Sequence, residues 1–120
     1  MQQNQANLSE LQETIRQFCE ARDWDQFHNP KDLAISLSLE ASEVLEHFQW
    51  KSAEEMKAHL VDGKDEIGHE LADVLYWVLL LANKANVNLT EAFASKMAHN
   101  EAKYPVEKAK GTHKKYTELN

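Results

Sequence analysis

The stretch LAISLSLEASEVLEHF, residues 33–48, and the stretch EIGHELADVLYWVLLL, residues 66–81, decide the fold of this chain. In both, apolar residues occupy nearly every side of a 3.6-residue period, which is typical of helices covered by other elements. The chain of 120 residues contains only 3 Gly and 2 Pro, a composition that favours helices throughout. The sequence therefore predicts an all-α protein with a four-helix-bundle-like fold.

Helix start and stop signals extend this prediction outward from the two apolar stretches. Ser9 followed by Gln12 fits a capping box, and Pro30 suits the first position of a helix. Pro105 stops the last helical pattern. The expected helices cover about 9–23, 30–49, a short stretch from residue 52, 65–84 and 89–103. Together they form a single predicted domain, residues 1–120, with an irregular basic tail from about residue 104.

Acidic side chains form a stripe through each of the two apolar helices. The members recur at spacings of 4, 3 and 4, which places them on one helix face: Ser36, Glu40, Glu43 and His47 on the first helix, and Glu66, Glu70, Asp73 and Trp77 on the second. Burying like-charged carboxylates is costly unless something compensates them, and neither stretch contains Lys or Arg. A divalent cation would compensate the charge, so the stripes predict a metal site.

The donor set indicates which metal this site would bind. Mg²⁺ prefers carboxylate oxygens and keeps several waters, which leaves room for a substrate phosphate. Zinc is disfavoured because the stripes offer no Cys and little His. Two other interpretations stay open on the residues alone: solvated stripes of ordinary amphipathic helices, or a di-iron bundle. The second would need Glu-x-x-His motifs, and only Glu66 with His69 provides one.

Composition and charge exclude several classes of protein. Net charge is −7, and residues 1–80 carry 16 acids against 6 Lys and Arg, so a nucleic-acid partner is not expected. This acidic region could hold divalent cations, and the alternative is a solvated acidic surface that serves solubility. No run of about 18 apolar residues occurs, so no membrane span is expected. Cys19 is the single cysteine, and a cytoplasmic location follows as the default.

The acids and several further motifs resemble the MazG-like family of all-α nucleotide pyrophosphohydrolases, and most closely its dCTP pyrophosphatase branch. The signature is Glu40-x-x-Glu43 followed after 26 residues by Glu70-x-x-Asp73. Further similar stretches are ARDWDQFH (21–28), EHFQWK (46–51), SKMAHN (95–100), KYP (103–105) and KKYT (114–117). These motifs cover roughly residues 11–119 in order, and the ordered set is far more specific than the four acids alone.

The resemblance implies an activity and a set of site residues. It implies hydrolysis of a (deoxy)nucleoside triphosphate to the monophosphate and pyrophosphate, by water attack at the α-phosphorus. It implies Mg²⁺, with Mn²⁺ as a substitute, bound by Glu40, Glu43, Glu70 and Asp73, which are also the catalytic acids. The expected substrate-binding residues are Trp24, His28, Trp50 and Trp77, with Lys96, Asn100 and Lys103 on one helix face toward the phosphates. A homodimer or homotetramer is expected, the latter as a dimer of dimers.

Two departures from the family leave the base preference open. Relatives can carry His where Ile15 aligns and Tyr where Trp77 aligns, and both positions lie near the expected pocket. We therefore take dCTP as the leading substrate, with dUTP or a modified nucleotide as the alternative. A non-catalytic helical interaction module is the alternative from a different class, but such a module has no need of four acids inside apolar helix surfaces.

Overall fold

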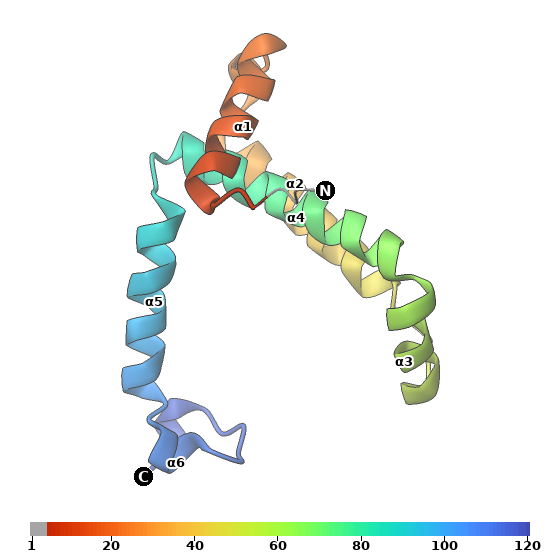
Figure 1. The fold of residues 1–120 in the computed structure, drawn as a ribbon, viewed down its shortest axis with the longest axis vertical. Helices are drawn as coiled ribbons and strands as arrows, with labels where there is room; N and C mark the ends of the chain where they lie inside the picture. Colours follow the sequence, from red (N-terminus) through yellow and green to blue (C-terminus); the bar gives the residue numbers. More distant parts are fainter. Residues whose placement is uncertain (1–4) are drawn as a thin grey trace. The chain divides into compact units, whose positions relative to one another are not determined.

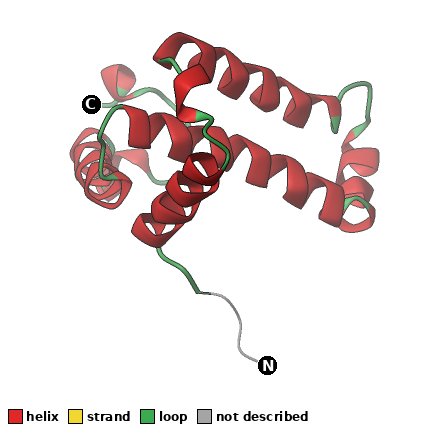
Figure 2. Cartoon of the chain, turned by 90° about the horizontal axis from the view of Figure 1, so that it is seen from above, coloured by secondary structure: helices red, strands yellow, loops and turns green. Residues whose placement is uncertain are grey.

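The computed structural model of the chain describes residues 5–120, and its regular elements there are all helical (Figure 2). In chain order they are α1 (Leu8–Ala21), the 3-10 helix η1 (Asp25–Phe27), α2 (Pro30–Glu46), α3 (Ala53–Asp62), α4 (Lys64–Lys84), α5 (Leu89–Lys103), α6 (Val106–Ala109) and the 3-10 helix η2 (Tyr116–Glu118). No strand occurs in residues 5–120. The prediction of an all-α fold is confirmed.

The start of α1 corrects the predicted capping box. The Asn7 side chain accepts a hydrogen bond of 2.9 Å from the Glu10 amide, and Glu10 accepts one of 3.2 Å from the Asn7 amide. The Ser9–Gln12 pair was therefore the wrong choice, although both pairs have the same spacing. A glutamate in the first turn also interacts favourably with the positive end of the helix dipole, which a glutamine does not. The helix ends at Ala21 rather than residue 23, where the chain turns through Asp23 in a left-handed conformation (φ 53°).

The other helix boundaries follow the sequence signals more closely. Asn29 caps α2 with Pro30 at its first position, and Ser52 forms a capping box with Glu55 at the start of α3. α5 covers the predicted residues. α2 ends three residues early, because residues 47–50 form a turn that leads to Trp50 in a left-handed conformation (φ 66°). The predicted break between α3 and α4 is a single residue, Gly63.

The structure divides into two compact units, Met1–Val87 and Asn88–Asn120. In the first unit α2 and α4 lie side by side, and α1 packs on α4 (Figure 1). One buried residue from each of these helices forms the core cluster: Cys19, Leu33 and Leu80. This arrangement brings the faces of α2 and α4 together, and so positions the predicted acids.

The second unit contains α5 and the tail, in which two short helical elements, α6 and η2, occur. α6 follows Pro105, whose φ of −61° is already suited to the start of a helix. η2 places Tyr116 edge-on to Tyr104, with ring centres 6.3 Å apart, and the Lys103 amine lies 4.7 Å from the centre of the Tyr116 ring. These aromatic contacts order the tail without any apolar period, which explains why periodicity could not detect them.

None of the helices within residues 5–120 combines the length and apolarity needed to cross a membrane.

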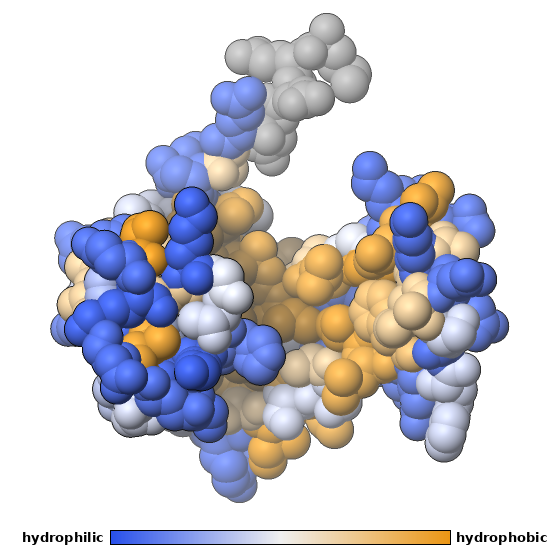
Figure 3. All heavy atoms as spheres, turned by 90° about the horizontal axis from the view of Figure 1, so that it is seen from below, coloured by the Kyte–Doolittle hydropathy of each residue, from blue (hydrophilic) through white to orange (hydrophobic). Residues whose placement is uncertain are grey.

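Large apolar side chains remain exposed in the first unit, and they support the predicted assembly. Leu39 is 63% exposed, Leu45 71% and Leu71 53%, and Figure 3 shows hydrophobic residues (orange) gathered over much of one face. Apolar area of this kind is typical of an interface between protein chains. We expect a homodimer or homotetramer in sedimentation at micromolar concentration. A species of 13.8 kDa, the mass of one chain, would contradict this prediction.

Candidate active site

Three of the four predicted metal-binding acids lie together between α2 and α4. Glu40 and Glu43 stand one turn apart on α2, and Glu70 stands on α4; each offers a carboxylate oxygen, and these oxygens all lie within 4.8 Å of one another. We call these three residues the acid cluster. Glu40 and Glu70 are half-buried and Glu43 is exposed. The stripes of the two helices therefore meet at these three residues.

Two oxygens of the acid cluster are suited to hold a cation. Glu40 Oε2 and Glu70 Oε1 are buried and have no hydrogen-bond partner. A buried polar atom without a partner costs free energy, which a bound cation would recover. The donors are all carboxylate oxygens, the ligands that hard divalent ions such as Mg²⁺ prefer. The residues present thus fit a divalent cation.

Crowding of the three carboxyl groups shifts their pKa values in opposite directions. Hydrogen bonding with Glu43, and to a smaller extent with Glu40, raises the pKa of Glu70 to about 8, and burial adds to this effect. Hydrogen bonding with Glu43 also raises the pKa of Glu40, and the negative charge of Asp73 adds to the effect. The pKa of Glu43 is lowered because it accepts hydrogen bonds from Glu70 and Glu40. The metal-free cluster therefore retains a proton at neutral pH.

The raised pKa of Glu70 predicts that the metal-free protein loses stability as the pH rises from about 4.5 toward 8. In this window the folded chain retains a proton that the unfolded chain, with its ordinary value of 4.5, has released; a rise in pH therefore favours unfolding. Glu70→Gln should flatten this part of the stability profile. The measurement is thermal melting in a chelator between pH 5 and 8, with Glu54→Gln, at an exposed position of α3, as the control. Equal slopes for wild type and Glu70→Gln would contradict the prediction.

Asp73 and Trp77 continue the stripe along α4 but lie outside the acid cluster. Asp73 is exposed, and it acts on the cluster through its charge, which raises the pKa of Glu40. Trp77 packs against the core cluster and stands edge-on to Tyr76, with ring centres 5.0 Å apart. Their roles in metal and substrate binding stay predictions.

His28 lines a separate cavity in the first unit. This cavity of about 360 Å³ is bordered by Ile15, Arg16, Cys19, Glu20, Asp25, His28, Leu80, Asn83 and Lys84. His28 Nδ1 is buried without a hydrogen-bond partner, so it is available to a ligand. Ile15, the position that departs from the family, lies in the same wall. Trp24 stands edge-on to Phe18 at 5.6 Å and is 39% exposed.

The remaining predicted substrate-binding residues are exposed or lie in the second unit. The Trp50 side chain is 92% exposed directly after the turn that ends α2. Lys96, Asn100 and Lys103 belong to α5, where Asn100 is half-buried and the two lysines are exposed. Their parts in base and phosphate binding stay predictions.

Sequence patterns missed a cavity of about 380 Å³ that adjoins the acid cluster. Its lining residues are Glu43, Glu46, His47, Lys51, His59 and Glu70. His47 was visible as the last member of the α2 stripe. His59 belongs to another helix and shows no motif, and Lys51 follows the turn after α2, so no spacing rule relates them to the acids.

Comparisons with known proteins found a family and several relatives. A MazG-like family model matches residues 35–119. The chain is 38% identical to mouse dCTP pyrophosphatase 1 over 114 residues, which cover 93% of this chain and 67% of the mouse protein. It is 36% identical to the human dCTP pyrophosphatase 1 with the same coverage. The crystal structure of a pyrophosphatase from Archaeoglobus fulgidus DSM 4304 superposes with a TM-score of 0.76 at 40% identity, over 88% of this chain and 98% of that one.

The matched region contains α4 and the larger part of α2, and it includes the entire acid cluster. The similarity of this chain to dCTP pyrophosphatase 1 and to the archaeal pyrophosphatase covers most of its length, and not only the acids. A non-catalytic helical module would explain neither the similarity nor the cluster. The chain belongs to the MazG-like family, as an all-α nucleotide pyrophosphohydrolase.

Proposed function

We propose that this enzyme hydrolyses dCTP, in the presence of Mg²⁺, to dCMP and pyrophosphate. The acid cluster is the observation that carries the proposal, because three carboxyl groups converge there with two buried oxygens that lack partners. The dCTP pyrophosphatases that resemble the chain over 93% of its length support the choice of base. dUTP and modified nucleotides are the alternatives, since Ile15 and Trp77 depart from relatives near the expected pocket.

The acid cluster and Asp73 would hold Mg²⁺. When bound, this ion neutralises charge on the phosphates and makes water a better nucleophile. Phosphoryl transfer needs mainly positioning and charge stabilisation, which a rigid pair of packed helices is suited to provide. Fixing the carboxylates on α2 and α4 would therefore keep the reacting phosphate in one place.

Glu43 is the residue that would orient the attacking water. Its lowered pKa keeps it ionised at neutral pH, so it can accept a hydrogen bond from water. It is also the exposed member of the acid cluster, which leaves an oxygen accessible to solvent. Glu40 and Glu70 are more enclosed, so their only role would be to hold the cation.

A panel of deoxy- and ribonucleoside triphosphates with Mg²⁺, scored for pyrophosphate, tests the proposal. We expect the highest kcat/KM with dCTP, and no pyrophosphate in a chelator. A triphosphate at 100 times its Kd should also stabilise the protein against thermal unfolding by roughly 2.7 kcal/mol. Pyrophosphate from no member of the panel, with no change in melting temperature, would refute the function.

Trp50 provides a direct test of base stacking. Its ring is 92% exposed, so Trp50→Ala should leave the fold of the chain unchanged. Stacking of a base on an aromatic ring is present in the ground state and the transition state alike; its loss should raise KM by roughly five- to a hundredfold and leave kcat unchanged. Steady-state kinetics measure both constants. A fall in kcat at constant KM would instead assign Trp50 to positioning the reacting phosphate.

A further inference from the structure

The cavity that adjoins the acid cluster combines carboxylates with nitrogen donors. Glu43 and Glu70 belong to the acid cluster, whereas Lys51, His47 and His59 bring an amine and two imidazoles. A volume of about 380 Å³ lies at the small end of ligand sites, which suits a fragment of a nucleotide better than the whole molecule. The cavity therefore extends from two residues of the acid cluster to groups that can bind an anion.

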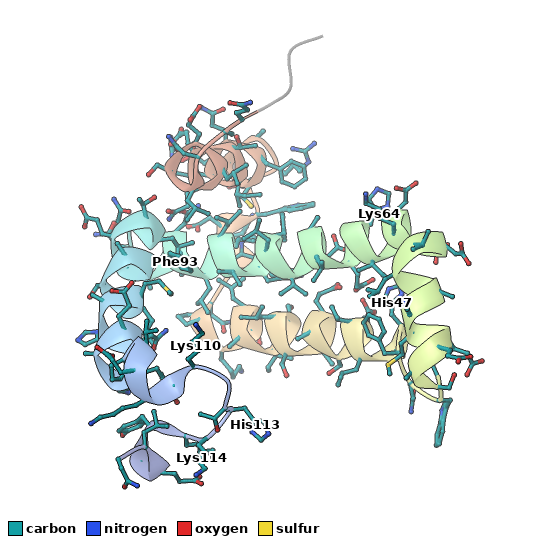
Figure 4. The ribbon with its side chains drawn as sticks, turned by 60° about the horizontal axis from the view of Figure 1, so that its bottom comes forward. His47, Lys64, Phe93, Lys110, His113 and Lys114 are labelled. Atoms are coloured by element: carbon teal, nitrogen blue, oxygen red, sulfur yellow. The ribbon has the colours of Figure 1, made fainter. Side chains whose placement is uncertain are left out.

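The two histidines form a hydrogen-bonded pair between the turn after α2 and helix α3. His47 Nδ1 lies 3.0 Å from His59 Nε2, and the rings stack with centres 5.2 Å apart. Figure 4 shows His47 where the end of α2 meets α3. When both imidazoles are neutral, only one of these two nitrogens carries a hydrogen, which it donates to the other. In either arrangement one of the remaining nitrogens, His47 Nε2 or His59 Nδ1, carries a hydrogen, so the pair keeps one further donor.

The position of the His59 ring depends on Gly63. A Cβ atom at Gly63 would collide with Cε1 of the ring and lie 2.7 Å from its Nδ1. Phe48 packs edge-on against His59, with the two ring centres 6.0 Å apart. Gly63 has a φ of −102°, which any residue can adopt, so the backbone does not require glycine there. The glycine instead leaves space for the imidazole.

We propose that His47, His59 and Lys51 bind the two terminal phosphates of the substrate, the part that leaves as pyrophosphate; this inference rests on the proposed function. A cation in the acid cluster would contact the phosphate chain, and the cavity continues from the cluster to these donors. Lys51 provides a positive charge and the histidine pair a directed hydrogen bond, a combination suited to a polyphosphate.

The acids in the cavity make this binding dependent on the cation. Glu46 is exposed in the same wall, and together with Glu43 and Glu70 it would repel free pyrophosphate. Binding should therefore be detected with Mg²⁺ and lost in a chelator. The donors would contact the leaving group and not the nucleoside part of the substrate. Their loss should therefore lower the affinity for pyrophosphate and leave the affinity for the nucleoside monophosphate unchanged.

Calorimetric binding of pyrophosphate and of dCMP, each with Mg²⁺, tests the inference without turnover. His59→Ala should lower the affinity for pyrophosphate by about tenfold or more, because a hydrogen bond to a charged group is lost. Gly63→Ala should act in the same direction, since it displaces the ring but removes no polar group. Gly68→Ala is the matched control: a Cβ at Gly68 meets nothing within 4 Å, so pyrophosphate affinity should stay within twofold of wild type. Affinity for dCMP should be unchanged in all three.

The outcomes separate this inference from the proposed function. Unchanged pyrophosphate affinity in His59→Ala and Gly63→Ala, in a protein that hydrolyses triphosphates, would overturn the inference and leave the function intact. Equal losses for pyrophosphate and dCMP would also overturn it, because they would indicate general damage to the site. A wild-type protein that hydrolyses no triphosphate would refute the function. If that protein also fails to bind pyrophosphate with Mg²⁺, the inference fails with it.

Discussion

Single alanine replacements in the acid cluster, and at Asp73, are expected to lower Mg²⁺-dependent release of pyrophosphate by about a hundredfold or more. Each would remove an oxygen donor to the cation, and even residues that only support metal ligands typically contribute 10- to 100-fold to affinity or activity. Helical content should be unchanged, because none of these side chains belongs to the core cluster. The metal-free variants should be at least as stable as wild type, since a replacement relieves repulsion among carboxylates.

Glu66→Gln is the matched control for these replacements. Glu66 lies one turn before Glu70 on the same helix, carries the same charge, and stays outside the acid cluster. Its activity should remain within about twofold of wild type, as expected for an exposed substitution. Rates with saturating Mg²⁺ and circular dichroism provide the two measurements. Near-normal turnover in any two of the four alanine variants would contradict the assignment of the metal site.

Hydrolysis in oxygen-18 water is expected to place the label in the nucleoside monophosphate. The chain has no Walker glycine loop, and its glycines are only Gly63, Gly68 and Gly111. Direct attack by an activated water is therefore simpler than a covalent phosphoenzyme. Pyrophosphate is also a better leaving group than a nucleoside alkoxide. Attack at the α-phosphorus transfers the solvent oxygen to the monophosphate and releases unlabelled pyrophosphate.

Mass spectrometry of the two products distinguishes the three sites of attack. The expected result is one label per monophosphate, one pyrophosphate per turnover and no early orthophosphate. Label in pyrophosphate would mean attack at the β-phosphorus and would refute the mechanism, although the family would stand. Orthophosphate as the first product would mean attack at the γ-phosphorus, which is incompatible with the proposed function as well.

The helices and the acid stripes were determined by local properties of the sequence. Apolar periodicity, the Asn29–Pro30 start and the Ser52–Glu55 capping box act within one or two turns, so the residues involved are close in the chain. The same holds for Glu40 and Glu43 on one face of α2. Where two equivalent local signals competed, as at the start of α1, spacing alone selected the wrong pair, because it does not weigh one cap against another.

The composition of the acid cluster was decided by the tertiary structure. Packing of α2 on α4 brings Glu70 to the pair on α2 and leaves Asp73 outside the cluster, although sequence spacing treats the two alike. The turn after α2 and the single-residue break at Gly63 place His59 against His47. Such contacts depend on the angle and register between helices, which the periodicity of a single helix does not encode. The sequence determined which residues could serve the chemistry, and only the packed helices decided which of them meet.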